Sequence, residues 1–138
     1  MTTDDDYRRG RHVVSALHVH LVFVTKYRRG VFDPAMIERC EQIMRDVCGG
    51  FGAHLVEFNG EHDHVHLRVE YPPKVAVSAL VNSLKGVSAR LLRSEFTGRV
   101  NRHSLRGHFW SPSYLAVSAG GAPLSVLREY IEGQRRPT

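Results

Sequence analysis

Hydrophobic and polar residues alternate early in the chain and then take a helical spacing. The stretch HVHLVFVT, at about residues 18–25, alternates and is rich in β-branched residues, which predicts a strand. Over about residues 34–47 the hydrophobic positions recur at helical spacing, with Asp33 placed as an N-cap and Pro34 in the first turn. The Gly49-Gly50 pair then predicts the end of this helix.

Two further alternating segments predict a β-hairpin. They extend over about residues 54–59 and 64–71, and a short turn centred on Gly60 connects them. Pro72 and Pro73 end the second segment, because proline cannot donate a hydrogen bond to a strand ladder. The two strands are therefore expected to pair antiparallel.

The second half of the chain repeats the order of helix and strand. Residues 77–96 place leucine and valine at helical spacing, and a loop is expected from there to about Trp110. The stretch at about residues 113–119 then predicts a fourth strand, and a last helix begins near Pro123.

The predicted order is βαββαβ followed by a C-terminal helix. This order is typical of an α+β sandwich of the ferredoxin-like or RRM-like kind, with an antiparallel sheet. One domain is expected over residues 1–138, because a chain of this length fits a single hydrophobic core. Within it, we expect residues 1–11 to form a flexible arm and residues 122–138 to form a mobile helix.

Charge points to a polyanionic partner. The formal net charge is +5, and 16 of the 19 basic residues are arginine, whose planar fork matches phosphate oxygens. A GC-rich genome is an alternative reason for the arginine bias, but it does not explain the net charge.

Other features predict a cytoplasmic location. The chain opens without an apolar signal core, and no stretch approaches the roughly 18 apolar residues of a membrane span. Cys40 and Cys48 lie too far apart in one predicted helix for an unstrained disulfide, so free thiols in a reducing compartment are expected. We therefore expect neither export nor insertion into a membrane.

The tetrapeptide HVHL occurs twice, at residues 18–21 and 64–67. In a strand, residues two apart point to the same face about 6.6 Å from each other, so both imidazoles of either copy could bind one metal ion. The motif alone is a weak signal, because strand histidines that only satisfy core hydrogen bonds are common. The residues around each copy must therefore decide which of the two is the better candidate for a metal site.

Acidic and basic neighbours favour the second copy. Glu61, His62 and Asp63 crowd the turn just before it, and carboxylates there can orient imidazole rings. The first copy lies in an apolar strand, which favours a structural or DNA-facing role for His18 and His20.

The stretch between residues 74 and 110 is strongly basic. Against the single acidic residue Glu95, it carries seven cationic side chains, and aromatic or imidazole rings near its end could stack on unpaired bases. This combination predicts a groove for single-stranded DNA. The alternative is a solvated basic helix face with Phe109 and Trp110 in the core. The predicted DNA-binding residues are Lys74, Lys85, Arg90, Arg93, Arg99, Arg102, Arg106 and Trp110.

The last predicted helix carries a tyrosine and a glutamine on one flank. Leu124, Leu127 and Ile131 form its hydrophobic stripe, while Tyr130 and Gln134 are four residues apart and lie together. Taken alone, the helix favours packing for Tyr130 and solvent exposure for Gln134.

Five segments, in this order and spacing, resemble one family. They are HLVFVTKYRRGVF, DHVHLRVEYPP, SALVNSLKGVSARLLRSEF, FWSPSYLAVSAGG and YIEGQ. The chain resembles, from His18 to Gln134, the TnpA-type single-tyrosine transposases of small bacterial insertion sequences, the 200/605 group.

The resemblance implies roles for four residues. His64 and His66 would be the paired histidines of the HUH motif, Tyr130 the nucleophile and Gln134 the third ligand of a divalent metal, Mg or Mn. It further implies a homodimer with composite active sites in trans that binds single-stranded DNA hairpins at element ends. Strands would be cut and rejoined through a 5′-phosphotyrosine intermediate, without a nucleotide cofactor.

Several points stay open at this stage. The general base is unassigned, with Glu61 and Asp63 as candidates by proximity, and Arg68 departs from the apolar residue expected after DHVHL. That arginine also replaces the third alternating histidine of a histidine-triad hydrolase. The non-enzymatic alternatives are an RNA-recognition-like module and a domesticated or inactive homologue that acts as a single-stranded nucleic-acid-binding regulator.

Overall fold

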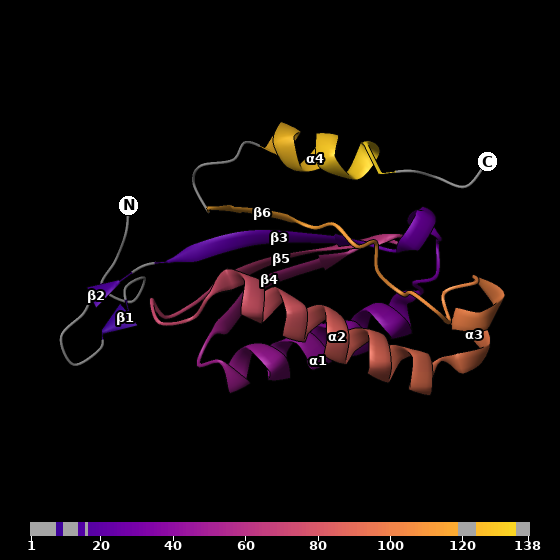
Figure 1. The fold of residues 1–138 in the computed structure, drawn as a ribbon, viewed down its shortest axis with the longest axis horizontal. Helices are drawn as coiled ribbons and strands as arrows, with labels where there is room; N and C mark the ends of the chain where they lie inside the picture. Colours follow the sequence, from indigo (N-terminus) through magenta and orange to yellow (C-terminus); the bar gives the residue numbers. More distant parts are fainter. Residues whose placement is uncertain (1–7, 10–13, 16, 119–123, 135–138) are drawn as a thin grey trace.

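The computed structural model describes residues 8–9, 14–15, 17–118 and 124–134, with side chains for 17–118 and 128–134. The predicted order of strands and helices is confirmed; the described residues add a short ladder of β1 and β2, a 3₁₀ turn at Lys26–Arg28 and the short helix α3 (Figure 1). The elements that form the domain are β3 (His18–Val24), α1 (Pro34–Gly50), β4 (His54–Gly60), β5 (His64–Glu70), α2 (Val77–Glu95), α3 (Thr97–Arg102), β6 (Leu115–Ser118) and α4 (Leu124–Glu132).

The central sheet has the strand order β4-β5-β3-β6, and all of its neighbouring strands are antiparallel. Its two middle strands, β3 and β5, are the strands that carry the two HVHL copies. Their register pairs Val22 with His66 and Val24 with His64. The predicted antiparallel α+β sandwich is confirmed, and both histidine pairs lie near its centre.

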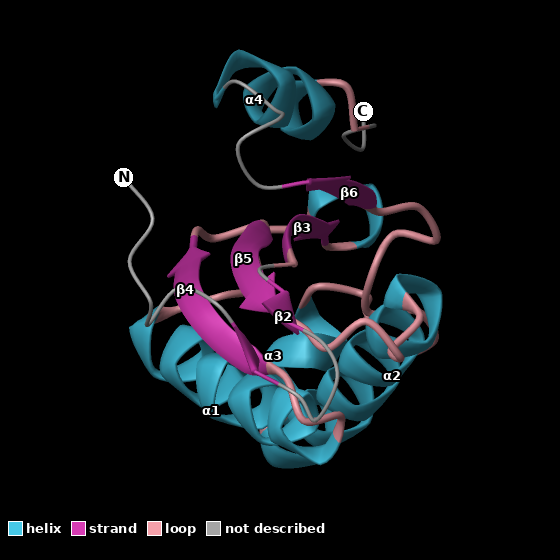
Figure 2. Cartoon of the chain, turned by 90° about the vertical axis from the view of Figure 1, so that its left-hand side faces the viewer, coloured by secondary structure: helices cyan, strands magenta, loops and turns pink. Residues whose placement is uncertain are grey.

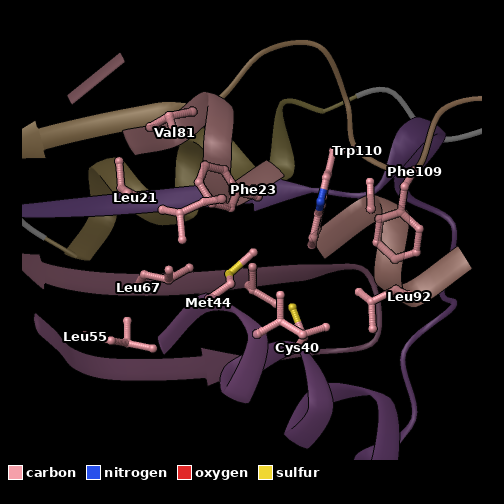
Figure 3. Packing of buried hydrophobic residues seen from close by; sticks show 14 of the residues in the cluster. Leu21, Phe23, Cys40, Met44, Leu55, Leu67, Val81, Leu92, Phe109 and Trp110 are labelled. Atoms are coloured by element: carbon pink, nitrogen blue, oxygen red, sulfur yellow. The ribbon is translucent and has the colours of Figure 1, made fainter. Parts of the chain in front are cut away.

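Helices α1 and α2 cover one face of the sheet (Figure 2). Strands β3 and β5 bury their odd-numbered side chains against these helices, because successive strand residues point to opposite faces. The even-numbered histidines of both HVHL copies consequently lie on the other face. The core beneath the helices includes Leu21, Phe23, Val65, Leu67, Val69, Met36, Cys40, Met44, Leu80, Leu84 and Leu92, several of which are drawn in Figure 3.

Helix α1 begins as predicted but ends later. The Asp33 carboxylate accepts a hydrogen bond from the Met36 amide at 2.8 Å and so caps the first turn. The helix continues through the glycine pair to Gly50, because Cys48 is still fully buried against the sheet. The turn is made by Gly52, whose φ of +69° is a left-handed conformation that glycine adopts without a steric penalty.

The segment expected to be a loop before Trp110 contains α3, which buries Val100. The chain after it returns to the core, where Phe109 and Trp110 are almost fully buried. The indole nitrogen of Trp110 donates a hydrogen bond to the Ser88 hydroxyl at 3.0 Å. The prediction that Trp110 stacks on DNA bases is therefore wrong, because its ring packs inside the domain.

Helix α4 covers part of the opposite face. Val22 and Val24 of β3 form a small second core with Leu115, Val117, Tyr130 and Ile131. At the other end of the chain, β1 (Arg8–Arg9) pairs with β2 (Val14–Ser15), so part of the expected arm is a two-stranded ladder. The remainder of that arm, and the residues that flank α4, lie outside the described residues. None of the helices in the described ranges is long and apolar enough to cross a membrane.

Candidate active site

The second HVHL copy lines a pocket of about 540 Å³ on the sheet face that carries α4. His64 and His66, both partly exposed, form its floor together with Val22 of the neighbouring strand. The turn between β4 and β5 supplies polar side chains to one side. The lining residues are Val22, Arg28, Asn59, Glu61, His62, Asp63, His64, His66, Arg128, Ile131 and Glu132.

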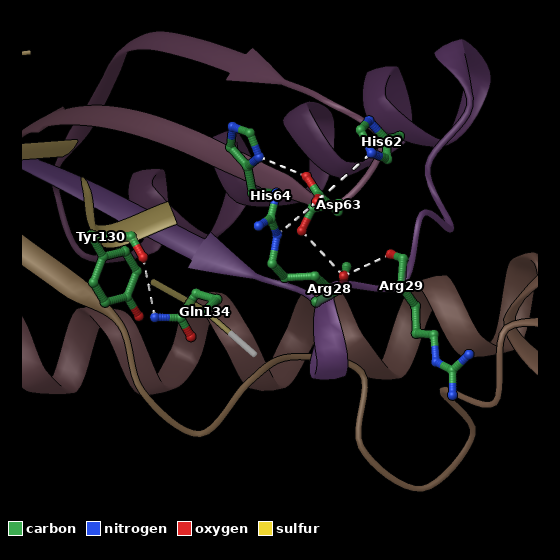
Figure 4. A network of polar contacts seen from close by, with 8 residues as sticks. Arg28, Arg29, His62, Asp63, His64, Tyr130 and Gln134 are labelled. Atoms are coloured by element: carbon green, nitrogen blue, oxygen red, sulfur yellow. Dashed lines mark hydrogen bonds and ion pairs between the residues drawn. The ribbon is translucent and has the colours of Figure 1, made fainter. Parts of the chain in front are cut away.

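Asp63 contacts the ring of His64 from one side (Figure 4). The Asp63 side chain is buried, with Oδ1 at 2.9 Å from Nδ1 of His64 and Oδ2 at 3.1 Å from Nε of Arg28. Burial acts to raise the pKa of Asp63, but the hydrogen bonds with His64 and Arg28 outweigh it and the pKa is lowered. Asp63 is therefore an ionised acceptor whose oxygens are both engaged, which removes it from the candidate general bases.

His66 contacts the first HVHL copy. Its Nε2 lies 2.9 Å from Nδ1 of His20, and the two rings stack with centroids 5.1 Å apart. Burial lowers the pKa of both histidines. The charge of Arg68 lowers the pKa of His20 further, and His20 lowers the pKa of His66 further. Of two neutral imidazoles, one can donate its N–H to the bare nitrogen of the other. His20 of the first copy therefore contacts the histidine pair that was predicted from the second copy alone.

Arg68, whose role the sequence left open, is held within the sheet surface. Its guanidinium donates to the Glu57 carboxylate at 3.1 Å and lies 3.3 Å from Nδ1 of His18. These contacts neutralise Arg68 and separate His18 from the pocket. The two histidines of the first copy thus have different surroundings.

Tyr130 and Gln134 lie together on α4 and the residues after it, as their spacing predicts, but they point away from His64 (Figure 4). The Tyr130 hydroxyl is 2.9 Å from the Ser113 hydroxyl, and the Gln134 side-chain oxygen accepts from Ser111 and Ser113 at 3.4 Å each. Burial raises the pKa of Tyr130, and the Ser113 hydrogen bond offsets part of that rise. In this arrangement the phenol is hydrogen-bonded within its own chain, outside the histidine pocket.

The predicted metal ligands are divided between two pockets within one chain. His64 and His66 line the large pocket, whereas Gln134 lines a separate one of about 230 Å³ together with Thr25 and Ser111. Across the described part of the chain, no three His, Cys, Asp or Glu side chains are grouped to hold a metal ion. Two imidazoles and an amide oxygen are a donor set that fits Mn²⁺, with positions left for other ligands, better than Mg²⁺, which prefers oxygen.

The predicted DNA-binding cations lie mainly on the helix side of the molecule, away from the histidines. Arg93 and Arg106 line a shallow pocket of about 480 Å³ beside α3. Two of the cations are engaged internally: Lys85 donates to the carbonyl of Ser111 at 2.7 Å, and Arg99 donates to the carbonyl of Val31. Burial also lowers the pKa of Lys85. The exposed members of the set are Lys74, Arg90, Arg102 and Arg106.

The contact between His20 and His66 is the part of the site that sequence analysis missed. A usable signal was present, because two identical motifs on strands that pair antiparallel place histidines on one face. The sequence did not determine the register between β3 and β5, which places His20 within hydrogen-bond distance of His66.

Known proteins resemble this chain along most of its length. The profile of the family described as "Transposase IS200 like" matches residues 13–134. The ISDra2 transposase TnpA of Deinococcus radiodurans is 29% identical over 129 residues, which are 94% of this chain and 91% of that protein. The transposase for insertion sequence element IS200 of Salmonella typhimurium is 31% identical, over 83% of this chain and 74% of that protein.

Solved structures agree with the fold. A crystal structure of a candidate transposase from Deinococcus radiodurans R1 has a TM-score of 0.86 and 31% identity, and the match covers 94% of this chain and 99% of that one. A REP-associated tyrosine transposase bound to a REP hairpin has a TM-score of 0.54 at 10% identity, over 92% and 69% of the two chains, and supports the fold alone. Because the family profile covers most of the chain and the fold agrees with it, the chain belongs to the IS200-like transposase family.

Proposed function

We propose that this protein cuts and rejoins single-stranded DNA at the hairpin ends of an insertion sequence, with Tyr130 as the nucleophile and His64, His66 and Gln134 as metal ligands. As a member of the IS200-like transposases it belongs to a family of DNA-cleaving enzymes. The observation that carries the proposal is the pair of imidazoles on one strand face, partly exposed in a pocket large enough for a phosphate. A DNA hairpin as substrate is part of the proposal; the REP-associated tyrosine transposase, which shares this fold, is bound to a REP hairpin.

The reaction exchanges one phosphate ester for another. The Tyr130 oxygen attacks the scissile phosphorus and loses its proton, while the bond from phosphorus to the 3′-oxygen breaks and that oxygen gains a proton. A bound Mn²⁺ or Mg²⁺ would act as a Lewis acid that neutralises the charge on the phosphate. The phenol, with an ordinary pKa of about 10, is a better leaving group than an alkoxide, so attack by a new 3′-hydroxyl releases Tyr130 and joins the strands without a nucleotide cofactor.

We further propose a homodimer with composite sites. Within one chain, Ser111 and Ser113 hold the Gln134 and Tyr130 side chains outside the histidine pocket. A complete site therefore requires α4 to dock elsewhere, and docking on a second copy would unite Tyr130 of one protomer with His64 and His66 of its partner. Such an arrangement would allow two DNA ends to be cut together.

Formation of a covalent adduct tests the chemistry. Protein incubated with a single-stranded hairpin end and Mn²⁺ is expected to form a 5′-phosphotyrosine adduct that mass spectrometry maps to Tyr130. Tyr130→Phe should abolish the adduct while hairpin affinity stays within a few-fold, because only one hydroxyl is removed. An adduct at Tyr27 or Tyr114, or hairpin binding with no adduct in the unaltered protein, would contradict the assignment; the second result would favour a DNA-binding regulator.

Subunit mixing tests the composite site. His64→Ala chains and Tyr130→Phe chains, each inactive alone, are mixed under conditions in which exchange of labelled subunits is verified. With trans sites, each mixed dimer has one intact site and one with both lesions, so adduct formation should return. With cis sites every site keeps one lesion, and the mixture would stay inactive.

A further inference from the structure

We propose that Asp63 and Arg28 are a positioning pair that fixes the proton of His64 on Nδ1 and thereby presents its Nε2 lone pair as the metal-binding atom. The inference rests on the proposed function for the use of that lone pair, but the ring state itself is a property of the folded chain. Arg28 and Asp63 would act only through His64 and would not touch the phosphate themselves.

The first step of the argument is the direction of the hydrogen bond between Asp63 and His64. The Asp63 side chain is 2% exposed, and its Oδ1 lies 2.9 Å from Nδ1 of His64. A carboxylate paired with Arg28 is ionised and can only accept hydrogen bonds, so Nδ1 of His64 must be the donor. A neutral imidazole with its hydrogen on Nδ1 carries its lone pair on Nε2, which is the nitrogen not engaged by Asp63.

The second step is that Asp63 cannot turn away. Its backbone carbonyl accepts hydrogen bonds from the Thr25 amide at 3.0 Å and from the buried Thr25 hydroxyl at 3.1 Å. The same hydroxyl also donates to the Arg29 carbonyl at 2.7 Å. Thr25 therefore connects the segment after β3 to the turn before β5, and the carboxylate stays beside the imidazole (Figure 4).

The third step is the backbone conformation at Tyr27 and Arg28, which positions the Arg28 side chain. Tyr27 and Arg28 have φ values of 59° and 55°, and two consecutive left-handed residues that are not glycine are uncommon. Such conformations persist only where surrounding contacts hold them, and they gather at functional sites. Here they bring Nε of Arg28 to 3.1 Å from Oδ2 of Asp63, the oxygen that His64 leaves free.

The other histidine of the pair lacks this support. The His66 ring is hydrogen-bonded to the ring of His20, and two imidazoles can exchange donor and acceptor roles. Of the two paired histidines, His64 is therefore the one that contacts the carboxylate. A merely structural role for the ion pair, closing the turn between β4 and β5, would not determine which His64 nitrogen carries the proton.

The test reads the His64 tautomer directly by ¹H–¹⁵N NMR in protein without added metal, at a pH of about 8.5, where free imidazole is neutral. The His64 signals are identified by their loss in a His64→Gln variant. The unaltered protein should carry the proton on Nδ1. In Asp63→Asn, Nε of Arg28 still needs an acceptor and takes the amide oxygen, so the amide NH₂ turns to Nδ1 of His64. The proton should then move to Nε2.

Two further variants separate the roles of the pair. Arg28→Gln keeps the carboxylate, so His64 should keep its proton on Nδ1. The double variant Arg28→Gln with Asp63→Asn frees the amide to turn either way, and a mixture of tautomers is expected. Glu95→Gln, which removes a carboxylate from the Arg39 ion pair on the helix side, is the matched control and should leave the His64 signals unchanged.

Mn²⁺ binding gives the functional readout. Loss of an orienting partner typically weakens metal binding by about 10–100-fold, so Asp63→Asn should lose that much affinity while hairpin binding and circular dichroism stay unchanged. A proton on Nε2 in the unaltered protein, or one that stays on Nδ1 in Asp63→Asn, would overturn the inference; the first result decides even if the variant fails to fold. An expected tautomer switch without any DNA adduct in the unaltered protein would instead count against the proposed function.

Discussion

At the residue scale, two identical tetrapeptides have different surroundings because of what lies next to them. The acidic turn before the second copy could be recognised in the sequence, and Asp63 does orient His64. The contact between His20 and His66 could not be predicted, because it depends on a strand register that local patterns do not determine. The sequence therefore predicted which side chains neighbour His64 along the chain, but not which side chain from another strand contacts His66.

The hydrogen bond between His20 and His66 leads to a prediction about metal affinity. It engages Nε2 of His66, and a metal ion that binds this nitrogen must replace it. His20→Phe keeps a ring in the stack but removes the hydrogen bond. Since such a bond is worth about 0.5–1.5 kcal/mol net, Mn²⁺ measured by calorimetry should bind roughly 2–10-fold more tightly.

The matched control is His18→Phe, the same change two residues earlier on the same strand. His18 contacts Arg68 and not the histidine pair, so Mn²⁺ affinity should be unchanged in this variant. A tenfold or greater loss of affinity in His20→Phe would mean that His20 is itself a metal ligand.

At the scale of elements, hydrophobic spacing identified every strand of the main sheet and the helices that cover it. It missed α3 because the segment TGRVNR has a single buried hydrophobic residue, Val100, and therefore no detectable period. The end of α1 was misplaced for a different reason. Gly49 and Gly50 are typical helix terminators, but burial of Cys48 carries the helix past them to the residue that needs a left-handed turn.

The two kinds of glycine at this helix end should respond oppositely to alanine. Gly52 has a φ of +69°, and a side chain in that conformation costs about 1–2 kcal/mol, so Gly52→Ala should lower the free energy of unfolding by that amount. Gly49 lies within the helix with nothing within 4 Å of an added Cβ, so Gly49→Ala should raise it by about 0.5–1 kcal/mol. Urea unfolding measures both, and changes of the same sign would contradict this account of the helix end.

At the scale of the whole molecule, the cations and the histidines lie on different sides. Helices α2 and α3 lie on the side of the sheet opposite to α4 (Figures 1 and 2). Residues of α4 line the histidine pocket, so the cations and the pocket are on different sides. A DNA hairpin held by the cations would need to extend a single strand around the domain to reach Tyr130. Binding and cleavage should therefore be separable by substitution.

Salt dependence identifies which cations contact DNA. Counterion release gives a slope in log affinity against log salt of about −0.7 for each phosphate contact on a single strand. Arg90→Gln and Arg106→Gln remove exposed charges, so each should weaken hairpin binding and reduce the slope by about 0.7. Fluorescence anisotropy with a labelled hairpin over a range of salt concentrations measures both quantities.

Arg45→Gln provides the control, because Arg45 is an exposed arginine of α1 that pairs with Glu41 and lies outside the basic stretch. It changes the net charge equally, so an effect of total charge alone would alter the slope in all three variants. A slope that changes only in Arg90→Gln and Arg106→Gln places the phosphates beside α2 and α3. If instead those two variants bind like the unaltered protein, the hairpin is held elsewhere, and the face that carries the histidines becomes the site of both binding and cleavage.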